Sequence, residues 1–346
     1  MSANFGSDNG AGAHEKIVNA LSIASQGCAP AYGNDDQTAR IERRLAELFE
    51  REVTVLLMAT GTAANCVGLA TLCSPFGGIY AHSEAHIVND ESTAPEFFTN
   101  GARQFTVGGA SAKPDLNALL KTIEVSGARG VHSVQPSVIA LSNLTELGAR
   151  FSSDEIRAYG ELAKSKGMKL FMDGARFANA IAGAKESPAD LTWRSGVDAV
   201  SFGATKNGAL AAEALVFFNP KEAELAAYHR KRSGHLWSKH RFLSAQFDAY
   251  LKDDLWLKLA FQANEKMRCL MSELRNISGI TVLSGGDGNE VFVSMTDAVA
   301  EALHAKGHAF YPWPSLPNAF RLVTSFATEQ REVDEFMADV RSLTLV

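Results

Sequence analysis

The sequence is poor in cysteine and contains no apolar run long enough to cross a bilayer. Its four cysteines show neither C-x-x-C spacing nor the pattern of a disulfide framework, which indicates a reducing compartment. The N-terminal residues MSANFGSDNGAGAHEK lack the apolar stretch of a signal peptide. We therefore expect a cytoplasmic protein that binds no membrane.

The chain also lacks an excess of basic residues. Its 33 lysines and arginines against 39 aspartates and glutamates give a formal net charge of −6, so no basic face is expected to attract nucleic acid. The 346 residues, of which 46% are hydrophobic, can bury the core of one large and one smaller domain. We find no internal repeat and no proline-rich linker. An enzyme is the expected class.

Short apolar segments alternate with helix-like segments through the middle of the chain. Near-continuous apolar strands separated by helices predict an α/β fold with a parallel sheet covered on both faces. The expected strands are VTVLLMA (53–59), GGIYAH (77–82), GVHSVQPSVIAL (130–141), MKLFMD (168–173), VDAVSF (197–202) and EALVFF (213–218).

The last part of the chain follows a different pattern, in which a long helix at about 255–275 precedes short strands and two further helices. This pattern predicts a small α+β domain. We place the boundary inside the basic segment 228–250, with a large domain at 36–245 and a small domain at 246–346. Residues 1–35 are expected to form an N-terminal segment that contributes to the active site.

The segment ATGTAAN (59–65) ends an expected strand and begins a helix. Backbone amides at a helix N-terminus form an anion site, to which Gly61 would give close access while Thr60 and Thr62 add hydroxyl groups. A tight turn with a threonine N-cap is the alternative interpretation. The segment matches neither the P-loop nor the Rossmann pattern. It is a candidate phosphate cradle.

The segment LFMDGARFANA (170–180) places Asp173 at the end of an apolar strand. The carboxylate could cap the following helix. It could instead face the pyridine nitrogen of a cofactor, where an adjacent anion raises the pKa of that nitrogen and lets the ring accept electrons. Arg176, three residues further on, suits a carboxylate or phenolate oxygen.

Lys206 lies between two apolar segments in SFGATKNGALAAEALVFF (201–218). Most lysines are solvated, but an amine held among apolar or cationic neighbours loses its proton more easily and becomes a nucleophile. A phosphate cradle, a carboxylate and a lysine, in this order along the chain, are the parts that a pyridoxal phosphate site needs. We therefore expect Lys206 to hold pyridoxal phosphate.

Two further segments contain candidate side chains. YAHSEAHIVNDE (80–91) has two histidines four residues apart, but it departs from the zinc-protease pattern and offers no third ligand, so no metal is expected. His86 could lie flat against the cofactor ring and act as a base, or be a solvated loop residue. Arg321, in FRLVTSF (320–326), could clamp the carboxylate of an amino acid or extend from a strand edge into solvent.

Taken together, these segments resemble the low-specificity threonine aldolase family, and above all its bacterial phenylserine-aldolase-like branch. The resemblance extends from about Phe5 to the last helix. It implies the aspartate-aminotransferase-type fold with a mostly parallel seven-stranded sheet, dependence on pyridoxal phosphate, and a homodimer or homotetramer with shared active sites. The segments that carry it are FGSDNGAGAH, AYGND, ATGTAAN, AHSEAHI, APEFF, MDGARFANA, TWRSGVDAVSFGATKNGALAAEALVFF and FRLVTSF.

The resemblance also implies roles for single residues. Lys206 matches the lysine that binds the cofactor, Asp173 the partner of the ring nitrogen, and His86 the histidine stacked on the ring. Gly61 and Thr62 match the phosphate cradle. The residues that match binding of the substrate carboxylate or a cofactor oxygen are Ser7, Arg176 and Arg321, and those that would reach a neighbouring subunit's site are Tyr32 and Lys231.

The chain departs from the family at two positions near the substrate hydroxyl. Many relatives have a Glu-Asn-Thr-His run whose histidine touches that hydroxyl, whereas this chain has Asn143, Leu144 and Thr145 within LSNLTEL. Asp90 stands where those relatives have an aromatic residue. Loss of the histidine suggests tolerance for aryl groups, and threonine and phenylserine both stay open as substrates.

The predicted reaction is reversible cleavage of a β-hydroxy-α-amino acid to glycine and an aldehyde. Its proton acceptor is expected to be His86, Asp90 or a water molecule held by them. One alternative is another reaction on the same scaffold, either β-elimination or transamination. A non-catalytic regulatory protein is a second alternative, but no basic patch or DNA-binding motif favours it.

Overall fold

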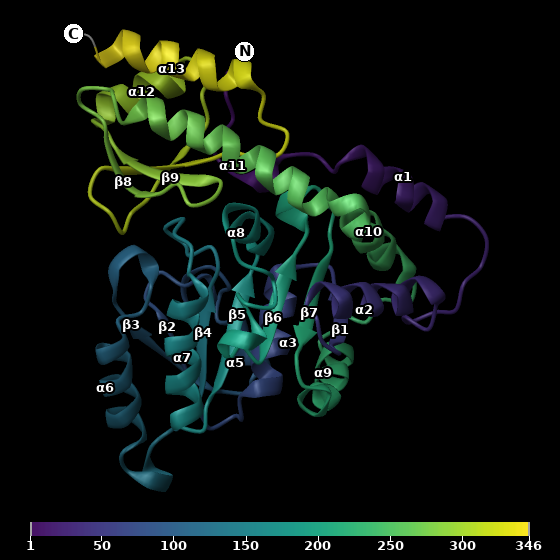
Figure 1. Ribbon diagram of the computed structural model, residues 1–346. Coiled ribbons are helices and arrows are strands. Elements are labelled where there is room, and N and C mark those ends of the chain that lie inside the picture. The colour runs from purple at the N-terminus through teal and green to yellow at the C-terminus, as the bar shows by residue number, and fades with distance from the viewer. Residues whose placement is uncertain (1, 345–346) are drawn as a thin grey trace.

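The computed structural model describes residues 2–344 of the chain. In the larger of its two units, seven strands form one sheet (Figure 1). Their spatial order is β1-β7-β6-β5-β4-β2-β3. This arrangement confirms the α/β class and the seven-stranded sheet. The bounds are β1 Thr54–Met58, β2 Gly77–His82, β3 Arg103–Val107, β4 Gln135–Ser142, β5 Lys169–Gly174, β6 Ala199–Gly203 and β7 Glu213–Phe217.

The sheet is mostly parallel, as expected, but β7 runs antiparallel to both neighbours, β6 and β1. Only residues 204–212 connect β6 to β7. A parallel crossover needs about a dozen residues or more, so this connection is too short for one. The edge strand β3 was not among the expected strands, because its sequence RQFTV is largely polar and its side chains are mostly exposed or half-buried.

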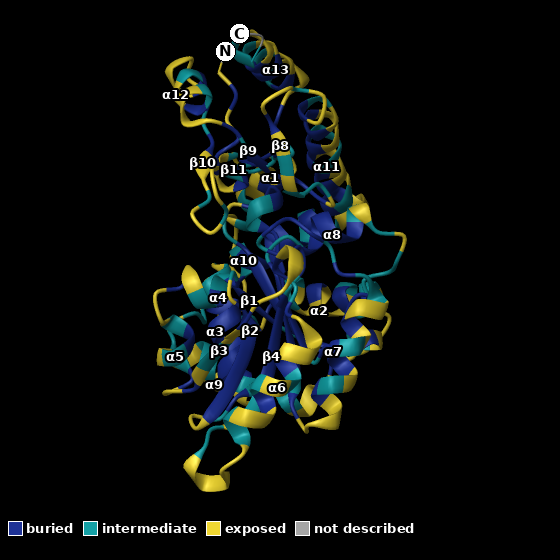
Figure 2. Ribbon diagram, turned by 90° about the vertical axis from the view of Figure 1, so that its left-hand side faces the viewer, coloured by how far each residue is buried: buried dark blue, intermediate teal, exposed yellow. Residues whose placement is uncertain are grey.

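Successive side chains of the central strands enter two separate cores. In β5, Leu170 and Met172 pack into the core formed with α2, α6 and α7, whereas Phe171 packs into the core formed with α3 and α9. Both faces of the sheet are therefore covered, and its central strands are dark blue between the helices in Figure 2. The helices are α2 Asp36–Leu48, α3 Gly61–Leu72, α6 Leu116–Gly127, α7 Ser153–Ser165 and α9 Pro220–Arg232.

The smaller unit is built on a four-stranded antiparallel sheet with the order β10-β11-β9-β8. The N-terminus joins this unit, since Asn4 forms a β-bridge with Ala309 and Phe5 is buried in the same core. The small α+β unit agrees with the sequence. Its elements are β8 Thr281–Gly285, β9 Glu290–Ser294, β10 Tyr311–Pro312, β11 Ala319–Val323, α12 Asp297–Ala305 and α13 Gln330–Thr344.

Helix α11 (Leu255–Leu274) connects the two units (Figure 1). Its first turns, with Trp256 and Leu259, belong to the large core, and its later turns, from Met267, belong to the small one. The boundary at 245/246 stays a prediction. The remaining helices are α1 Glu15–Ala24, α4 His86–Asn89, α5 Ala94–Phe98, α8 Phe177–Gly183 and α10 Arg241–Leu251. Within residues 2–344, no helix has both the length and the apolar character needed to span a membrane.

The strand directions bring several chain segments to one edge of the large sheet. Strands β2, β4, β5 and β6 are mutually parallel, and β1 shares their direction because both β1 and β6 are antiparallel to β7. The carboxyl ends of these five strands therefore meet where β7 begins. In open α/β sheets, ligands bind at such an edge.

Candidate active site

A cavity of about 280 Å³ lies at the edge where the parallel strands end. It brings together six of the residues that the sequence singled out: Gly61, Thr62, His86, Asp173, Arg176 and Lys206. They come from four separate segments of the large unit. The other lining residues are Asn9, Ala59, Thr60, Asn65, Glu91, Ser142, Leu144, Thr145, Glu146, Ala175, Thr205 and Glu213.

Helix α3 begins at the cavity wall. Thr60 is its N-cap, and the Thr60 hydroxyl oxygen accepts a hydrogen bond of 3.2 Å from the backbone N–H of Ala63. The N–H groups of a first helical turn have no partner within the helix, and the helix dipole makes them favourable for an anion. Gly61 and Thr62 therefore present donors to the cavity. The cap and the anion site are both compatible with this geometry.

A chain of hydrogen bonds connects Asp173 to His86 through two buried residues. The amide of Asn65 donates to Asp173 Oδ2 at 2.7 Å and to Glu91 Oε1 at 2.9 Å. Glu91 Oε1 also lies 2.9 Å from Nδ1 of His86. The Ser201 hydroxyl in turn donates to the side-chain oxygen Oδ1 of Asn65 at 2.9 Å. This bond fixes the orientation of the Asn65 side-chain amide. The network holds the Asp173 carboxylate and the His86 ring in place.

The same network accounts for a cluster with metal-like composition. Among the described residues, His86, Glu91 and Asp173 have potential ligand atoms within 4.8 Å of one another. The Asn65 amide joins the two carboxylates, and the histidine nitrogen is paired with Glu91. Hydrogen bonds thus explain why these groups gather, and nothing in the arrangement requires an ion.

Lys206 sits in a short loop between β6 and β7 that is tightly fixed. The side-chain amide of Asn207 donates to Tyr250 Oη and to the carbonyl oxygen of Trp256, both at 2.8 Å. Gly208 has φ +106°, and a Cβ atom there would lie 2.8 Å from a Leu259 methyl group. The position therefore requires glycine. The loop fixes the backbone from which the lysine extends into the cavity.

The surroundings of Lys206 favour its neutral amine. Burial lowers the pKa of Lys206, and the positive charge of Arg176 lowers it further, while Asp8, Asp173 and Glu290 act in the opposite direction. The net direction is downward. A lowered pKa favours a nucleophilic amine, and that role stays a prediction for Lys206.

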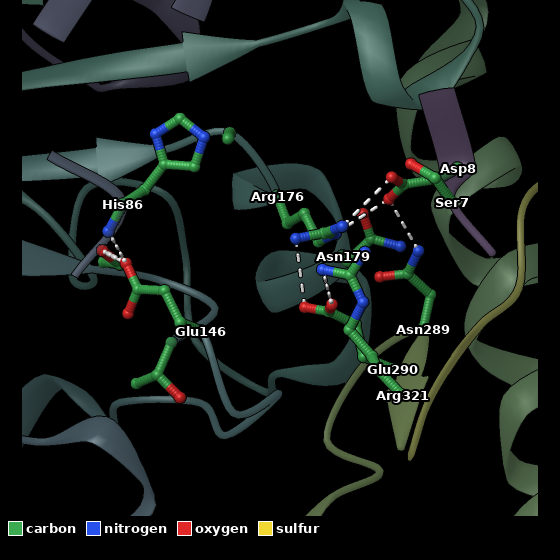
Figure 3. Close-up of polar contacts among 12 residues, drawn as sticks. Ser7, Asp8, His86, Glu146, Arg176, Asn179, Asn289, Glu290 and Arg321 are labelled. Atoms are coloured by element: carbon green, nitrogen blue, oxygen red, sulfur yellow. Dashed lines mark hydrogen bonds and ion pairs between the residues drawn. The ribbon is translucent and has the colours of Figure 1, made fainter. Parts of the chain in front are cut away.

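Arg176 forms the centre of a buried charge cluster, drawn in Figure 3. Its guanidinium donates to both carboxylate oxygens of Asp8, at 2.8 and 3.0 Å, and lies 3.1 Å from Glu290 Oε1. Burial opposes the charge on Arg176, but these acids outweigh it and raise the pKa of the guanidinium. The Arg176 and Lys206 charges likewise overcome burial and lower the pKa of Asp8.

Arg321 reaches this cluster from β11 of the smaller unit. Its Nη1 atom lies 3.9 Å from Glu290 Oε2, and its Nη2 atom donates to the Gly6 carbonyl oxygen at 3.3 Å. The guanidinium also lies over the Trp313 ring, 5.1 Å from its centroid. Arg321 is therefore a held, partly buried residue, and the interpretation as a strand-edge residue extending into solvent does not describe it.

Two acids of the cavity wall have strongly raised pKa values. Burial raises the pKa of Glu146 to about 7, with Asp173 adding to the effect and hydrogen bonds from Ser142 and the His86 backbone opposing it. Burial also raises the pKa of Glu213 to about 7, against a Thr205 hydrogen bond and the Lys206 charge. Both acids can exchange a proton near neutral pH.

The structure does not bring every predicted residue to the cavity wall. Asp90 is exposed at the end of α4 and is not among the lining residues, so the geometry of this chain gives it no contact with the cavity. Ser7 caps a short turn next to Asp8. Tyr32 and Lys231 lie outside the lining, with the lysine Nζ 5.1 Å from the centre of the tyrosine ring.

Sequence reasoning missed the residues that orient the predicted ones. Asn65 lies four residues after Gly61, a spacing that puts both on one helix face, and this signal could have identified it. Glu213 opens an apolar strand, where an acid is unusual. Glu91, Glu146 and Glu290 carry no such local signal, because their roles depend on contacts with distant segments.

Comparison with known proteins gives a consistent result. Residues 4–298 match the family model described as beta-eliminating lyase. The chain is 37% identical to a low-specificity L-threonine aldolase of Pseudomonas sp., over 99% of this chain and 98% of the relative. It is also 37% identical to the low-specificity L-threonine aldolase of Pseudomonas aeruginosa, over 97% of this chain and 96% of that protein.

Solved structures agree with the sequence matches. The threonine aldolase of Leishmania major superposes with a TM-score of 0.92 at 27% identity, covering 99% of each chain. An aspartate aminotransferase of Thermotoga maritima superposes with a TM-score of 0.76 at 13% identity, over 100% of this chain and 92% of that one. The second likeness shows the fold alone, and it is the fold that the sequence predicted.

Proposed function

Since this chain belongs to the beta-eliminating lyase family, and within it to the low-specificity threonine aldolases, we propose that it reversibly cleaves β-hydroxy-α-amino acids to glycine and an aldehyde. The cofactor is pyridoxal phosphate. The observation that carries the proposal is that a lysine with a lowered pKa, an oriented carboxylate and a helix N-terminus line one cavity.

The residues of the cavity fit the cofactor. Lys206 would bind its aldehyde carbon through the amine, which burial favours in the neutral form. Asp173, fixed by Asn65, would face the ring nitrogen, and His86, fixed by Glu91, would lie against the ring. The phosphate would rest on the N-terminus of α3 at Gly61 and Thr62. When bound, pyridoxal phosphate supplies the electron sink for the charge left at the substrate Cα.

The protein's own residues position the amino acid. Arg321 and Arg176, with Ser7, would hold the substrate carboxylate. Arg176 lines the cavity, and the two guanidinium groups lie 3.1 Å (Arg176) and 3.9 Å (Arg321) from the carboxylate oxygens of Glu290. Contact with the substrate carboxylate would fix the rotation about Cα so that the bond to Cβ is the one that breaks, and misplacement would cost orders of magnitude in rate. An acid of the cavity wall would accept the proton of the hydroxyl group.

Product analysis tests this function directly. The purified protein with its cofactor is incubated with L-threonine and with phenylserine, and glycine, acetaldehyde and benzaldehyde are measured. Release of glycine and aldehyde in equal amounts is the expected result. A protein that binds the cofactor but releases neither from any β-hydroxy amino acid would contradict the proposal.

A second candidate is β-elimination, because the matching family model carries that description. This reaction removes the Cα proton and leaves the Cα–Cβ bond intact, so it releases a keto acid and ammonia instead of glycine. Measurement of pyruvate from serine or 2-oxobutanoate from threonine separates the two functions, and transamination is detected by the same keto-acid assay with an added amino acceptor.

We also propose a cytoplasmic homodimer or homotetramer whose subunits share active sites, with no nucleic-acid partner. Tyr32 and Lys231, paired at the surface of the chain and away from its own cavity, are the residues that would reach a neighbouring site. The net charge of −6 supports the absence of nucleic acid. Light scattering during gel filtration gives the assembly size, and a monomer that is fully active would contradict shared sites.

A further inference from the structure

We propose that Glu146 accepts the proton of the substrate's β-hydroxyl group, with Ser142 and the backbone of His86 as its positioning partners. This inference rests on the proposed aldolase function and names the group that the sequence left open. The sequence-based candidates were His86, Asp90 and a water molecule between them. The structure favours a residue outside that set.

Glu146 is held in the cavity wall by two contacts. Its Oε1 atom accepts a hydrogen bond of 2.5 Å from the Ser142 hydroxyl and one of 2.9 Å from the His86 backbone N–H (Figure 3). The residue is only half-buried, and it lines the cavity. The carboxylate is thus fixed in direction and accessible to a ligand in the cavity, which are two requirements for a general base.

The alternative acceptors are less suited. Nδ1 of His86 is paired with Glu91 at 2.9 Å. Burial disfavours charge on this ring, but the Glu91 hydrogen bond and the charges of Asp173 and Glu91 outweigh it and raise the pKa of His86, so the ring keeps its proton at higher pH. Asp90 is exposed and away from the cavity. Glu213 is 5% exposed and would be less accessible to substrate than Glu146.

The pKa of Glu146 suits the role of a general base. Burial raises the pKa of its carboxyl to about 7, and Asp173, on β5, raises it as well. The hydrogen bonds from Ser142, on β4, and from the backbone of His86, on α4, lower it. A general base works best when its pKa lies near the working pH, because it is then both available and basic.

The position of Glu146 also suits a bound amino acid. Figure 3 shows His86 and Glu146 on one side of the view and the cluster of Arg176, Glu290 and Arg321 on the other. The cavity wall includes both Arg176 and Glu146, so one ligand can reach from one to the other. An amino acid held by its carboxylate at the arginines and by its nitrogen at the Lys206 end leaves its hydroxyl-bearing side chain for the Glu146 side.

The proton and electron balance of this step is complete without a further reactant. The hydroxyl proton moves to the Glu146 carboxylate, and the electron pair of the O–H bond becomes the second C–O bond of the aldehyde. The electron pair of the Cα–Cβ bond stays at Cα, which then takes up one proton to give glycine. The overall reaction therefore transfers one proton from oxygen to carbon, and Glu146 returns to the carboxylate form by releasing its proton.

The test uses Glu146→Gln in the cofactor-loaded protein and compares two reactions. Exchange of the glycine α-hydrogen with deuterated solvent, followed by NMR, needs the cofactor and Lys206 but involves no hydroxyl group. Cleavage of threonine or phenylserine needs the cofactor and Lys206 and, in addition, a group that accepts the hydroxyl proton. We expect the variant to keep the cofactor absorbance and the glycine exchange while its cleavage rate falls by about 10²–10⁴-fold, the contribution typical of a general base.

A second pair of variants covers the case in which Glu146→Gln folds poorly. Glu146→Asp keeps a carboxylate and should restore part of the cleavage rate. Ser142→Ala removes a hydrogen bond that lowers the pKa of Glu146. It should therefore shift the low-pH limb of kcat/KM, expected near pH 7 in the wild type, to higher pH. An infrared titration of the protonated carboxyl band gives the same shift without turnover.

The outcomes separate this inference from the proposed function. A wild-type protein that exchanges glycine but cleaves no β-hydroxy amino acid contradicts the function itself. If the wild type cleaves and Glu146→Gln cleaves equally fast with the same low-pH limb, Glu146 is not the acceptor. Parallel loss of cofactor absorbance, exchange and cleavage in Glu146→Gln, with no pH shift in Ser142→Ala, also overturns the inference, because Glu146 would then only support the fold.

Discussion

The two ends of the cavity hold their charges in opposite ways. At the arginine end, Arg176 and Arg321 face Asp8 and Glu290, so two positive charges are matched by two negative charges at short distance. At the opposite end, the acid end, burial raises the pKa of Glu146 to about 7. The arginine end is suited to hold a fixed charge, and the acid end to move a proton.

This difference has a structural origin. The arginine end joins the two units of the chain, since Arg321 and Glu290 come from the smaller sheet and Arg176 from the larger one. The acid end belongs to the large unit, but the loop that carries Glu146 also packs against the smaller sheet through Leu147.

Loss of the amine between the two ends should have the largest effect. Lys206→Ala removes the predicted attachment point of the cofactor, so cleavage of threonine and phenylserine should fall to background, a loss on the order of 10⁶-fold or more. Aldehyde release is the measurement. Lys221→Ala, which replaces an exposed lysine of α9, is the matched control and should behave like the wild type. Undiminished cleavage by Lys206→Ala would contradict the assignment of the cofactor to Lys206 and, with it, the roles of the two ends of the cavity.

The arginine end is tested next by Arg321→Lys. Lysine keeps the positive charge but loses the planar fork that binds a carboxylate through two hydrogen bonds. Because a hydrogen bond to a charged group is worth about 1.5–3 kcal/mol, kcat/KM for threonine should fall by about 10–100-fold. The decrease should appear in KM and also in kcat, because the same contact orients the bond that breaks. An effect confined to kcat would argue against carboxylate binding at Arg321.

Part of this cavity could be predicted from the sequence. The strand-then-turn patterns located Lys206, Asp173 and the start of α3 correctly in one cavity, because each lies at the end of a strand and parallel strands end at one edge. The resemblance to a family favoured cofactor or substrate roles for His86 and the two arginines, for which the residues alone had left other interpretations open. The connection at 204–212 is too short for a parallel crossover, so its length also predicts that β7 runs antiparallel.

The partners of these residues could not be predicted from local sequence. Glu290 and Arg176 are separated by more than a hundred positions, and only the packing of the smaller sheet on the larger one brings them to 3.1 Å. Likewise, the raised pKa of Glu146 comes from burial, which a single sequence does not reveal. The sequence therefore predicted which side chains gather at the cavity better than it predicted the residues that orient them.

The charge balance of the arginine end is tested by Glu290→Gln. This change leaves two arginines opposite Asp8 alone, and loss of one partner from a buried ion pair typically costs about 3–5 kcal/mol of unfolding free energy. The unpaired positive charge should, however, bind a substrate carboxylate more tightly. Melting temperatures with and without glycine should show a less stable variant that gains more from glycine than the wild type does.

The matched control for this variant is Glu301→Gln, which neutralises an exposed acid of α12. Both of its melting temperatures should stay close to those of the wild type. A Glu290→Gln protein as stable as this control would show that the cluster does not depend on the balance of its charges.

The raised pKa of Glu146 should make the unfolding free energy depend on pH, an effect smaller than that of Glu290→Gln. The pKa of Glu146 rises from its ordinary value of 4.5 to about 7 on folding, so between these values the folded chain binds more protons than the unfolded chain. The unfolding free energy should therefore fall as pH rises from about 4.5 to 7, by at most about 1.4 kcal/mol per pKa unit. Since glutamine does not titrate, Glu146→Gln should gain stability relative to the wild type between pH 5 and pH 8. A stability difference that is constant over this range would contradict the raised pKa.

The smallest effect is expected for Asp90→Asn. Because Asp90 is exposed and away from the cavity wall, turnover and diastereomer preference should stay within about twofold of the wild type. Steady-state rates on threonine and allo-threonine give the comparison. A loss of the size expected for Glu146→Gln would transfer the proton-accepting role from the acid end described here to Asp90.

In the proposed site, the nitrogen of Lys206 holds pyridoxal phosphate in this cavity. Borohydride reduction of the active protein, proteolysis and mass spectrometry of the peptides locate that bond directly. We predict a single modified peptide that contains Lys206, formed in proportion to the activity lost. A reduced cofactor attached to another lysine, with the Lys206 peptide unmodified, would contradict the account.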